Sequence, residues 1–393
     1  MSAQTAARAE RMSRVDTAWL RMDNDVNLMM IVGVWLLEPA VAYEAVVKRV
    51  GDKLLQYDRF RQRVVQDAMG ARWELDEAFD IRRHVVREKL VVRKGESREQ
   101  ALQRRCGQLA TTPLDPAHPL WTFHLIENFD GGSALIARIH HCIGDGIALI
   151  SVTLSITDGG TDPPKRRKRA PEEEAEDDWL TEVFKPLTEL TVKAIGMYGG
   201  GVAKSMDLLA HPQAGLAGSI DMAKAGYKVL GDVAALALMP DDSPTRLKGK
   251  PMGEKVVAWN EPLPLDAVKA IGKGLGCSVN DVLLSCVAGA IGQYLRDRGE
   301  DPAGKEIRAM VPVNLRPMEK AWKLGNRFGL VPLTLPIGIE NPIERVFDVR
   351  ARMAALKDSY QPVLAFAVLA VAGLMIKPVQ DQILALFAKK TTA

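Results

Sequence analysis

Residues 133–146 read SALIARIHHCIGDG, a largely apolar run that ends in two adjacent histidines and a glycine-flanked aspartate. The run predicts a strand over 133–141, and the apolar residues after it predict a helix over 147–156. Successive side chains of a strand face opposite sides of the sheet. We therefore expect one of His140 and His141 to face a cleft and the other to face the interior.

The loop HHCIGDG carries groups suited to proton transfer. Imidazole titrates near pH 6.5, so a neutral histidine is a competent base at cytoplasmic pH. Asp145 lies four residues after His141, where it could orient the ring or bind an arginine and brace the loop. Gly144 and Gly146 permit tight turns that a side chain would obstruct. The residues alone leave open a buried histidine pair beside an ordinary Asp-Gly turn.

Other chemistries find little support in the sequence. The segment HHxxxD has no third ligand at a suitable spacing, and none of the four cysteines forms a CxxC pair, so we expect no metal site. No GxSxG nucleophile elbow is present. Cys142 is expected to face away from His141 in a strand, which makes it packing material rather than a nucleophile.

Composition places the chain among ordinary globular proteins. It has 393 residues, 47% hydrophobic and 26% charged, which excludes a disordered or fibrous chain and predicts two or three domains. The formal net charge of +3 is no signal for binding a polyanion, so nucleic acid is not an expected partner.

The N-terminus and the apolar runs bear on location. The opening MSAQTAARAERMSR lacks the apolar segment of a signal peptide, and no run reaches the roughly 18 apolar residues of a membrane span. We therefore expect a cytoplasmic protein.

Apolar periodicity and turn residues predict the elements around this loop. Asp130-Gly131-Gly132 predicts a hairpin turn between the strand at 133–141 and a strand at 120–128. The other predicted elements of the first half are a strand at 29–37, a helix at 42–57, strand and turn material at 73–86, and a helix at 98–111.

A charged segment separates the two halves. KRRKR at 165–169 and an acidic block at 172–178 predict a solvated linker, followed by helical sequence over 179–240. The second half is predicted to contain helices at 265–275, 279–298 and 345–360, strands at 307–315 and 330–337, and an apolar segment at 363–376. Helices and strands without strict alternation favour an α+β fold with mixed sheets. We divide the chain into an N-terminal domain (1–158), a linker (159–250) and a C-terminal domain (251–393).

HHxxxDG resembles the active-site motif of acyl-CoA-dependent acyltransferases of the condensation and chloramphenicol-acetyltransferase type. More narrowly, the chain resembles the bacterial wax ester synthase/diacylglycerol acyltransferase family over nearly its whole length and in the expected order. The matching segments are the opening MSRVD with Trp19-Leu20, Pro119-Leu120-Trp121, Asn280-Asp281-Val282, RAMVPVNLRP at 308–317, and GNRFG at 325–329.

The resemblance implies two chloramphenicol-acetyltransferase-like domains with an active-site tunnel between them. It implies acyl transfer from acyl-CoA to diacylglycerol or a long-chain alcohol, with His141 as general base and no metal or retained cofactor. His140 is then a support residue, Asp145 is chiefly structural, and Gly146 completes the motif. Asn280, Asp281 and Asn326 are candidates for substrate binding, although Asn280 and Asp281 also suit a helix start.

The resemblance also implies a lipid environment and rival functions. A lipid substrate implies peripheral association with a membrane or lipid-droplet surface, for which the helical segment 180–236 is a candidate. The rivals are another condensation-type acyltransferase and an inactive lipid-binding homologue. Family members usually continue beyond Ala393, so the resemblance also implies an incomplete, less soluble C-terminal domain.

Overall fold

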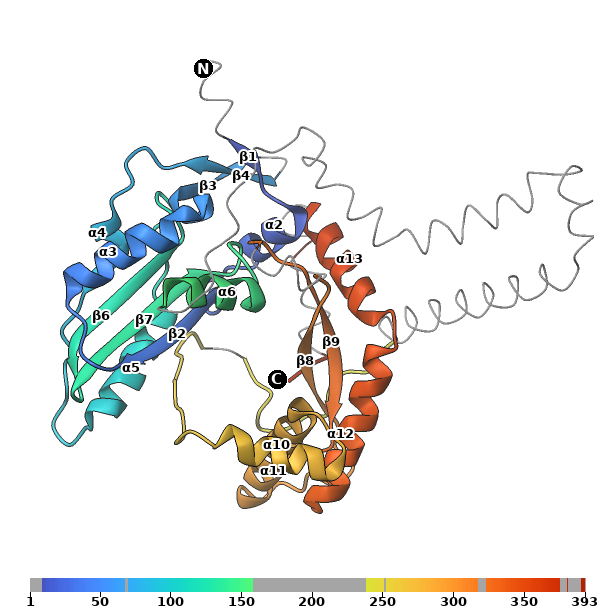
Figure 1. Ribbon diagram of the computed structural model, residues 1–393. Helices are drawn as coiled ribbons and strands as arrows, with labels where there is room; N and C mark the ends of the chain where they lie inside the picture. The colour runs from blue at the N-terminus through green and yellow to red at the C-terminus, as the bar shows by residue number, and fades with distance from the viewer. Residues whose placement is uncertain are drawn as a thin grey trace, which may run out of the picture.

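A computed structural model describes residues 9–67, 70–157, 238–250, 252–316, 323–374, 380 and 390–392. Within these ranges the chain forms one four-stranded mixed sheet, one three-stranded sheet, one two-stranded sheet and flanking helices (Figure 1). This confirms the predicted α+β class. The charged linker at 165–178 and nearly all of the predicted helical region 179–240 lie outside the described residues.

The four-stranded sheet carries the histidine loop. Its order is β2 (Met30–Leu37), β7 (Gly132–His140), β6 (Trp121–Phe129) and β5 (Val85–Arg87). β7 pairs antiparallel with both neighbours, whereas β5 pairs parallel with β6. The predicted hairpin turn joins β6 to β7, and Asp130 and Gly131 both have positive φ, as a tight two-residue turn requires.

Both faces of this sheet are covered, which explains why β7 is apolar almost throughout. Leu135 and Ala137 pack in one cluster with side chains of helix α3 (Tyr43–Lys53). The alternate residues Ala134 and Ile136 pack in another cluster with helix α5 (Arg98–Ala110). A strand buried on both faces needs a continuous apolar run rather than an alternating pattern. β7 is therefore held firmly up to its end at His140.

The remaining elements of the first half frame this sheet. Helix α6 (Gly146–Ile156) follows the histidine loop and contributes Leu149 and Val152 to the cluster on the α3 side. The other elements are β1 (Glu10–Arg11), β4 (Gly70–Leu75) and β3 (Gln62–Asp67), which form the three-stranded sheet, two short 3-10 turns at Leu54–Gln56 and Asp58–Arg61, and α4 (Ile81–His84).

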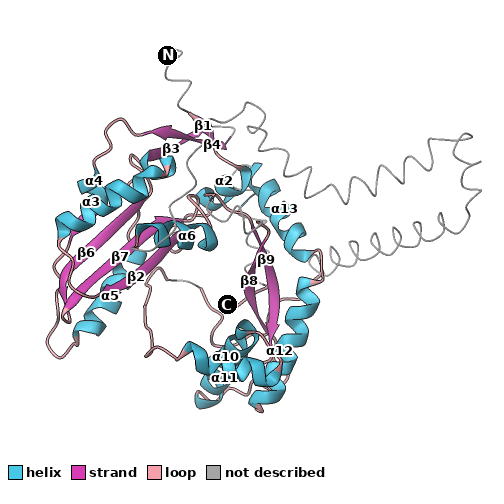
Figure 2. Cartoon of the chain, viewed as in Figure 1, coloured by secondary structure: helices cyan, strands magenta, loops and turns pink. Residues whose placement is uncertain are grey.

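The second half is built on the antiparallel pair β8 (Ile307–Asn314) and β9 (Phe328–Leu335). Helices α11 (Val279–Asp297) and α12 (Pro342–Lys357) pack against this pair, and α10 (Leu265–Leu275) lies beside α11 (Figure 2).

One helix of the N-terminal segment joins the second half. Helix α2 (Arg14–Arg21) packs against α13 (Gln361–Leu374), and Trp19 shares a cluster with Phe328 and Phe366. A Cβ at Gly373 would lie 1.9 Å from the carbonyl oxygen of Arg14, so the two helices touch backbone to backbone. Residues near the start of the chain thus form part of the core of its C-terminal half.

Several predicted boundaries differ from the structure. The segment predicted as strand and turn at 73–86 contains the short helix α4, because the Asp80 side chain accepts a hydrogen bond from the Arg82 backbone N–H and caps it. The strand β3 was not predicted, since QRVVQD is largely polar. Helix α12 starts three residues before the predicted 345, with Asn341 as its cap and Pro342 in its first turn.

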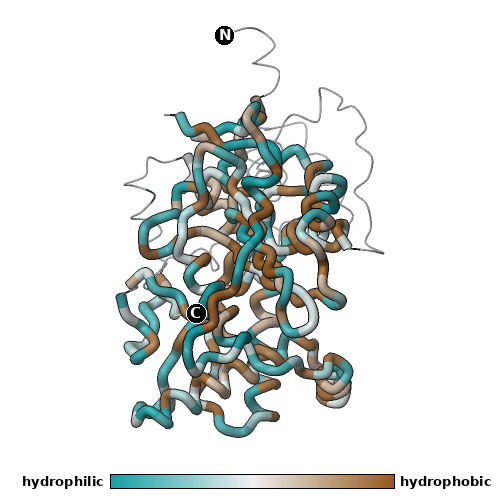
Figure 3. The backbone as a smooth tube through the Cα atoms, turned by 90° about the vertical axis from the view of Figure 1, so that its left-hand side faces the viewer, coloured by the Kyte–Doolittle hydropathy of each residue, from teal (hydrophilic) through white to brown (hydrophobic). Residues whose placement is uncertain are grey.

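No single helix among the described residues is long and apolar enough to cross a membrane. The helices α10 and α11 reach that length and hydropathy together but are bent by 99°. In Figure 3 hydrophobic and hydrophilic residues alternate at short intervals along much of the backbone.

The contact between β9 and α13 predicts that alanine substitution at two glycines changes the unfolding free energy in opposite directions. A Cβ at Gly329 would lie 1.9 Å from the Pro362 carbonyl oxygen, whereas one at Gly274 in α10 meets nothing within 4 Å. Gly329→Ala should destabilise the fold by about 1–3 kcal/mol, and Gly274→Ala should stabilise it by up to about 1 kcal/mol. Urea unfolding of both variants measures this. Equal effects of the two would contradict the close approach.

Candidate active site

The histidine loop docks directly onto a segment of the second half. The His141 backbone N–H donates to the Met29 carbonyl (2.8 Å), which continues the pairing of β7 with its neighbour. Gly144 forms an isolated bridge with Gly325, where the Gly325 N–H donates to the Ile143 carbonyl (3.0 Å). Gly325 has φ +99°, a conformation that side chains rarely adopt. The two halves of the chain therefore meet at the loop itself.

The ring of His141 is held by Asn326. His141 Nδ1 lies 3.0 Å from Asn326 Oδ1. The Asn326 Nδ2 group donates to Asp16 Oδ1 (2.7 Å) and to the His141 carbonyl oxygen (2.7 Å). Because both amide protons are directed at acceptors, the amide oxygen must face the ring, so Nδ1 carries the imidazole proton. Nε2 is then left with its lone pair, available to accept a proton.

Aromatic rings complete the surroundings of His141. The Trp19 ring stacks on the imidazole with centroids 4.2 Å apart and planes 11° apart, and Phe328 lies 5.8 Å away. Burial lowers the pKa of His141, while its hydrogen bond with Asn326 acts in the opposite direction. A lowered pKa keeps this imidazole neutral at pH 7, the form in which it accepts a proton.

His140 faces the other way, as the strand geometry predicts. Its ring is buried, and its Nδ1 accepts a hydrogen bond from the Cys142 backbone N–H (3.0 Å). Nδ1 is therefore unprotonated, and Nε2, which lies 3.1 Å from Asp23 Oδ2, carries the proton. The His140 ring thus stabilises the conformation of the histidine loop through its hydrogen bond with the Cys142 backbone. Cys142 is buried as well, in agreement with a packing role.

Asp145 binds an arginine and does not touch the His141 ring. Its Oδ1 caps α6 by accepting from the Ala148 N–H (2.9 Å). Its Oδ2 accepts from Arg316 Nη2 (3.1 Å) and from the Arg327 backbone N–H (3.0 Å). The pair with Arg316 is almost fully buried. Of the two roles open from the sequence, the structure shows the bracing one.

The glycines of the motif differ from expectation. Gly146 is the exposed first residue of α6, and a Cβ there would meet nothing within 4 Å, so no tight turn requires it. At Gly144 a Cβ would be 3.4 Å from Leu324 and 3.5 Å from the Gly325 nitrogen, which is ordinary van der Waals contact, so space does not require glycine there either.

The three candidates for substrate binding occupy different places. Asn326 lies on His141, as described above. Asp281 belongs to the capping box of α11, in which Ser278 is the cap, and Asn280 is exposed in the same helical turn. Asp281 thus stabilises the start of α11, as one of the two interpretations predicted, but as the third residue of the capping box and not as the N-cap itself. Substrate binding by Asn280 and Asp281 stays a prediction.

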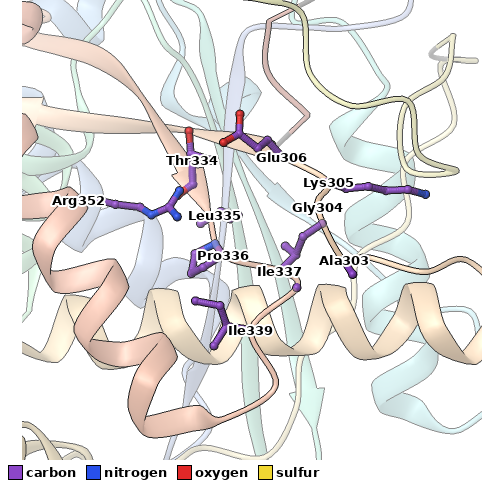
Figure 4. Close-up of a pocket in the computed structure, with 11 residues that line it drawn as sticks. Ala303, Gly304, Lys305, Glu306, Thr334, Leu335, Pro336, Ile337, Ile339 and Arg352 are labelled. Carbon is purple, nitrogen blue, oxygen red and sulfur yellow. The ribbon is translucent and has the colours of Figure 1, made fainter.

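A hollow of about 380 Å³ lies elsewhere, between the loop at 303–306 and the end of β9 (Figure 4). Arg352 reaches its edge, but its guanidinium is paired with Asp348 and donates to the Thr334 carbonyl. None of the residues that surround His141 lines it. This hollow is therefore not the site at which a substrate would meet His141.

Comparison with known families decides the identity of this site. The description "Wax ester synthase/diacylglycerol acyltransferase catalytic domain" matches residues 12–283, and "WS/DGAT C-terminal domain" matches residues 324–393. The chain belongs to the wax ester synthase/diacylglycerol acyltransferase family. Both segments that meet at His141 lie inside these matches, and the family confirms acyl transfer as the class of activity.

Curated relatives of this family are similar over most of the chain. The probable diacylglycerol O-acyltransferase tgs1 of Mycobacterium tuberculosis is 25% identical over 369 residues, which cover 92% of this chain and 74% of that protein. The probable diacylglycerol O-acyltransferase tgs2 of the same species is 26% identical over 383 residues, with 92% and 77% covered.

Solved structures share the fold. The wax ester synthase/diacylglycerol acyltransferase of Marinobacter aquaeolei VT8 has a TM-score of 0.55 at 20% identity, with 98% of this chain and 80% of that chain covered. A starter condensation domain of rhizomide synthetase, solved with C8-CoA, has a TM-score of 0.57 at 14% identity, with 94% and 76% covered. These similarities confirm the predicted chloramphenicol-acetyltransferase-like fold; the tunnel and the domain boundaries stay predictions.

Sequence reasoning gave no role to three side chains that this acyltransferase places at or beside the loop. Asp16 and Trp19 lie more than a hundred residues before His141, and Arg316 lies well after it. All three fall within short motifs by which the sequence resembles the family, the opening MSRVD with Trp19-Leu20 and RAMVPVNLRP at 308–317, and this was the one signal that pointed to them. Among the described residues, no three His, Cys, Asp or Glu side chains form a group that could hold a metal.

The buried pair of Asp145 and Arg316 predicts a stability effect. Asp145→Asn keeps an acceptor for the α6 cap but removes the charge that is hydrogen-bonded to Arg316, at a cost of about 3 kcal/mol in unfolding free energy. Urea unfolding measures this. Glu44→Gln is a matched control, because Glu44 pairs with Arg82 at an exposed site and its loss should cost no more than about 1 kcal/mol. An Asp145→Asn variant of unchanged stability without activity would instead give this carboxylate a direct part in the reaction.

Proposed function

We propose that this chain transfers a long-chain acyl group from acyl-CoA to diacylglycerol, forming triacylglycerol and CoA, and that long-chain alcohols can replace diacylglycerol to form wax esters. The names of the curated relatives support diacylglycerol as the acceptor. The observation that carries the mechanism is the contact between His141 Nδ1 and Asn326 Oδ1, from which we infer a proton on Nδ1 and a free lone pair on Nε2.

The proposed step begins with deprotonation of the acceptor. Nε2 of His141 removes the proton from the alcohol as its oxygen attacks the thioester carbonyl carbon. The tetrahedral intermediate then collapses, the carbon–sulfur bond breaks, and the proton on Nε2 passes to the sulfur of CoA. General base catalysis of this kind contributes typically about 10²- to 10⁴-fold. The step needs no acyl-enzyme, metal or retained cofactor.

The neighbours of His141 suit this cycle. Asn326 holds Nδ1–H, so the ring cannot turn its basic nitrogen away from a substrate. The face of the Trp19 indole stabilises the imidazolium that forms during transfer, since a cation over an aromatic face is attracted to it. Asp145 and His140 act by holding the loop.

The proposal is tested with purified protein, labelled palmitoyl-CoA, and diacylglycerol, hexadecanol or an amine as acceptor. We expect triacylglycerol and a smaller yield of wax ester. His141→Ala should lower kcat by at least about 10²-fold, because it removes the base, and should leave the enzyme folded at the assay temperature. His140→Ala should lower the melting temperature more and kcat less. Product with the amine alone would favour the condensation-type rival, and binding without turnover would favour the inactive lipid-binding homologue.

The pH dependence follows from the direction of the His141 shift. Burial lowers the pKa of His141 from its ordinary value, so the ring stays neutral to a lower pH than a free imidazole. The acid limb of kcat/KM should therefore have its midpoint below about pH 6.5. Initial rates between pH 5 and 8, on an enzyme shown to be folded at each pH, measure this. A midpoint above pH 7 contradicts a desolvated base.

We also propose that the protein works in the cytoplasm, bound to the surface of a membrane or lipid droplet. Support comes from α10, where Leu265, Val268, Ile271 and Leu275 recur at helical spacing. Leu265 and Ile271 are exposed to solvent. The same helix carries Lys269 and Lys273, whose positive charges favour anionic lipid headgroups. The predicted lipid surface at 180–236 lies outside the described residues.

Flotation with phosphatidylglycerol vesicles that contain diacylglycerol tests this surface. Leu265→Ser combined with Ile271→Ser should reduce the bound fraction several-fold. Leu36→Ser is the control, since Leu36 is equally exposed but lies on β2. Equal binding of all three proteins would exclude α10 as the lipid contact.

A further inference from the structure

The proton position on His141 depends on a residue that the ring does not touch. An amide side chain such as that of Asn326 can turn over by exchanging its oxygen and nitrogen, and the flipped form would present N–H groups to Nδ1. That form would require Nδ1 to accept and would move the imidazole proton to Nε2, the nitrogen that must act as base. Whatever prevents the flip thus helps to decide which nitrogen is basic, together with the hydrogen bond between the ring and the backbone of His141 itself.

Asp16 supplies the constraint. Its Oδ1 accepts from both the side chain (2.7 Å) and the backbone N–H (3.0 Å) of Asn326. A carboxylate oxygen accepts hydrogen bonds and, when ionised, donates none, so a flipped amide would set two oxygens against each other. The His141 carbonyl alone is a weaker constraint, because it offers one neutral acceptor. Burial outweighs the hydrogen bonds from Asn326 and raises the pKa of Asp16 overall, and in either protonation state the carboxyl group keeps an oxygen that can accept from Asn326.

The surroundings of Asp16 leave this carboxylate little freedom. It lies in the first turn of α2, where Ser13 caps the helix and accepts from the Asp16 N–H (3.1 Å). The residue is only 4% exposed. A Cβ on Gly325 would lie 3.4 Å from Asp16 Oδ2, so the carboxylate is packed against the backbone that precedes Asn326.

We propose that Asp16 is a positioning residue that fixes the tautomer of His141 through Asn326. The relay spans three parts of the chain: helix α2, the segment 325–327 and the histidine loop. Its essential property is an acceptor oxygen at Asp16 Oδ1, not the negative charge. The inference rests on the proposed role of His141 as base, and it adds how that base is prepared for the reaction.

The first test separates positioning from folding by substitution. Asp16→Ala should lower kcat by about 10- to 100-fold, the range typical of groups that orient a functional histidine, with KM for acyl-CoA changed less than about 2-fold. Asp16→Asn keeps an oxygen that can accept from Asn326 and should recover kcat to within about 3-fold of the parent. Asp76→Ala is the control, because Asp76 is a buried carboxylate that pairs with His118 and has no contact with the relay. It should lower stability and leave kcat unchanged.

The second test reads the tautomer without turnover. The chain has six histidines, so the ¹⁵N ring signals of His141 are assigned by their loss in His141→Gln. The parent and Asp16→Asn should show a protonated Nδ1 and a bare Nε2. Asp16→Ala should show a mixture or the reverse.

Three results would overturn the proposal: unchanged kcat in Asp16→Ala, a protonated Nδ1 in Asp16→Ala, or a loss in Asp16→Asn as large as in Asn326→Ala. If Asp16→Ala does not fold, a loss of kcat in Asp16→Asn as large as in Asn326→Ala still overturns the proposal. Absence of transfer by the parent, with the Nδ1 proton present and dependent on Asp16, would refute the proposed function and leave the relay intact.

Discussion

The buried carboxylate of Asp145 is the interaction on which the rest of the site depends. One oxygen caps the N-terminus of α6, which directly follows the histidine loop. The other oxygen accepts hydrogen bonds from Arg316 and from the Arg327 backbone N–H. A single charge thereby fixes a helix, a loop and the segment that contains Asn326. Breaking a buried pair of this kind is strongly unfavourable, because the remaining arginine would keep its desolvation cost without compensation. Asp145 thus holds the backbone beside Asn326, together with the bridge between Gly144 and Gly325 and the hydrogen bonds from Asn326 to Asp16.

The surroundings of His141 are thus assembled at a junction of three segments that lie far apart in the sequence. β7, buried on both faces, delivers His141 at a fixed position. Helix α2 comes from the start of the chain, yet it packs with α13 and β9 and places Trp19 against the imidazole. The lowered pKa of His141 arises mainly from the burial that these contacts produce. The residues that pack around His141, such as Trp19 and Phe328, are therefore also the ones whose burial of the ring lowers its pKa.

Much of this arrangement was predictable from the sequence, and the remainder has physical reasons. The β6–β7 hairpin follows from apolar runs and an Asp-Gly-Gly turn, which are local signals. The opposite orientation of His140 and His141 follows from strand geometry alone. The acyltransferase family was identified from ordered motifs. The partner of Asp145 was left open, since which arginine approaches a carboxylate depends on tertiary packing.

The roles of Asp16 and Asn326 show the limit most clearly. Asn326 was predicted to bind substrate, and nothing in the string GNRFG indicates that its amide is directed to a histidine far away in the sequence. Asp16 reads as an ordinary acidic residue in the first turn of a helix, where it favours the helix dipole. Only the fold shows that its side chain points across to the second half.

The contact between His141 and Asn326 also has a consequence for the order in which the protein is made. The two residues are 185 positions apart, so the ribosome adds Asn326 about 10 to 40 s after His141 at ordinary rates of synthesis. During that interval the nascent N-terminal half carries the motif but lacks the amide that contacts the His141 ring. The surroundings of His141 are therefore complete only once the second half has begun to fold against the first.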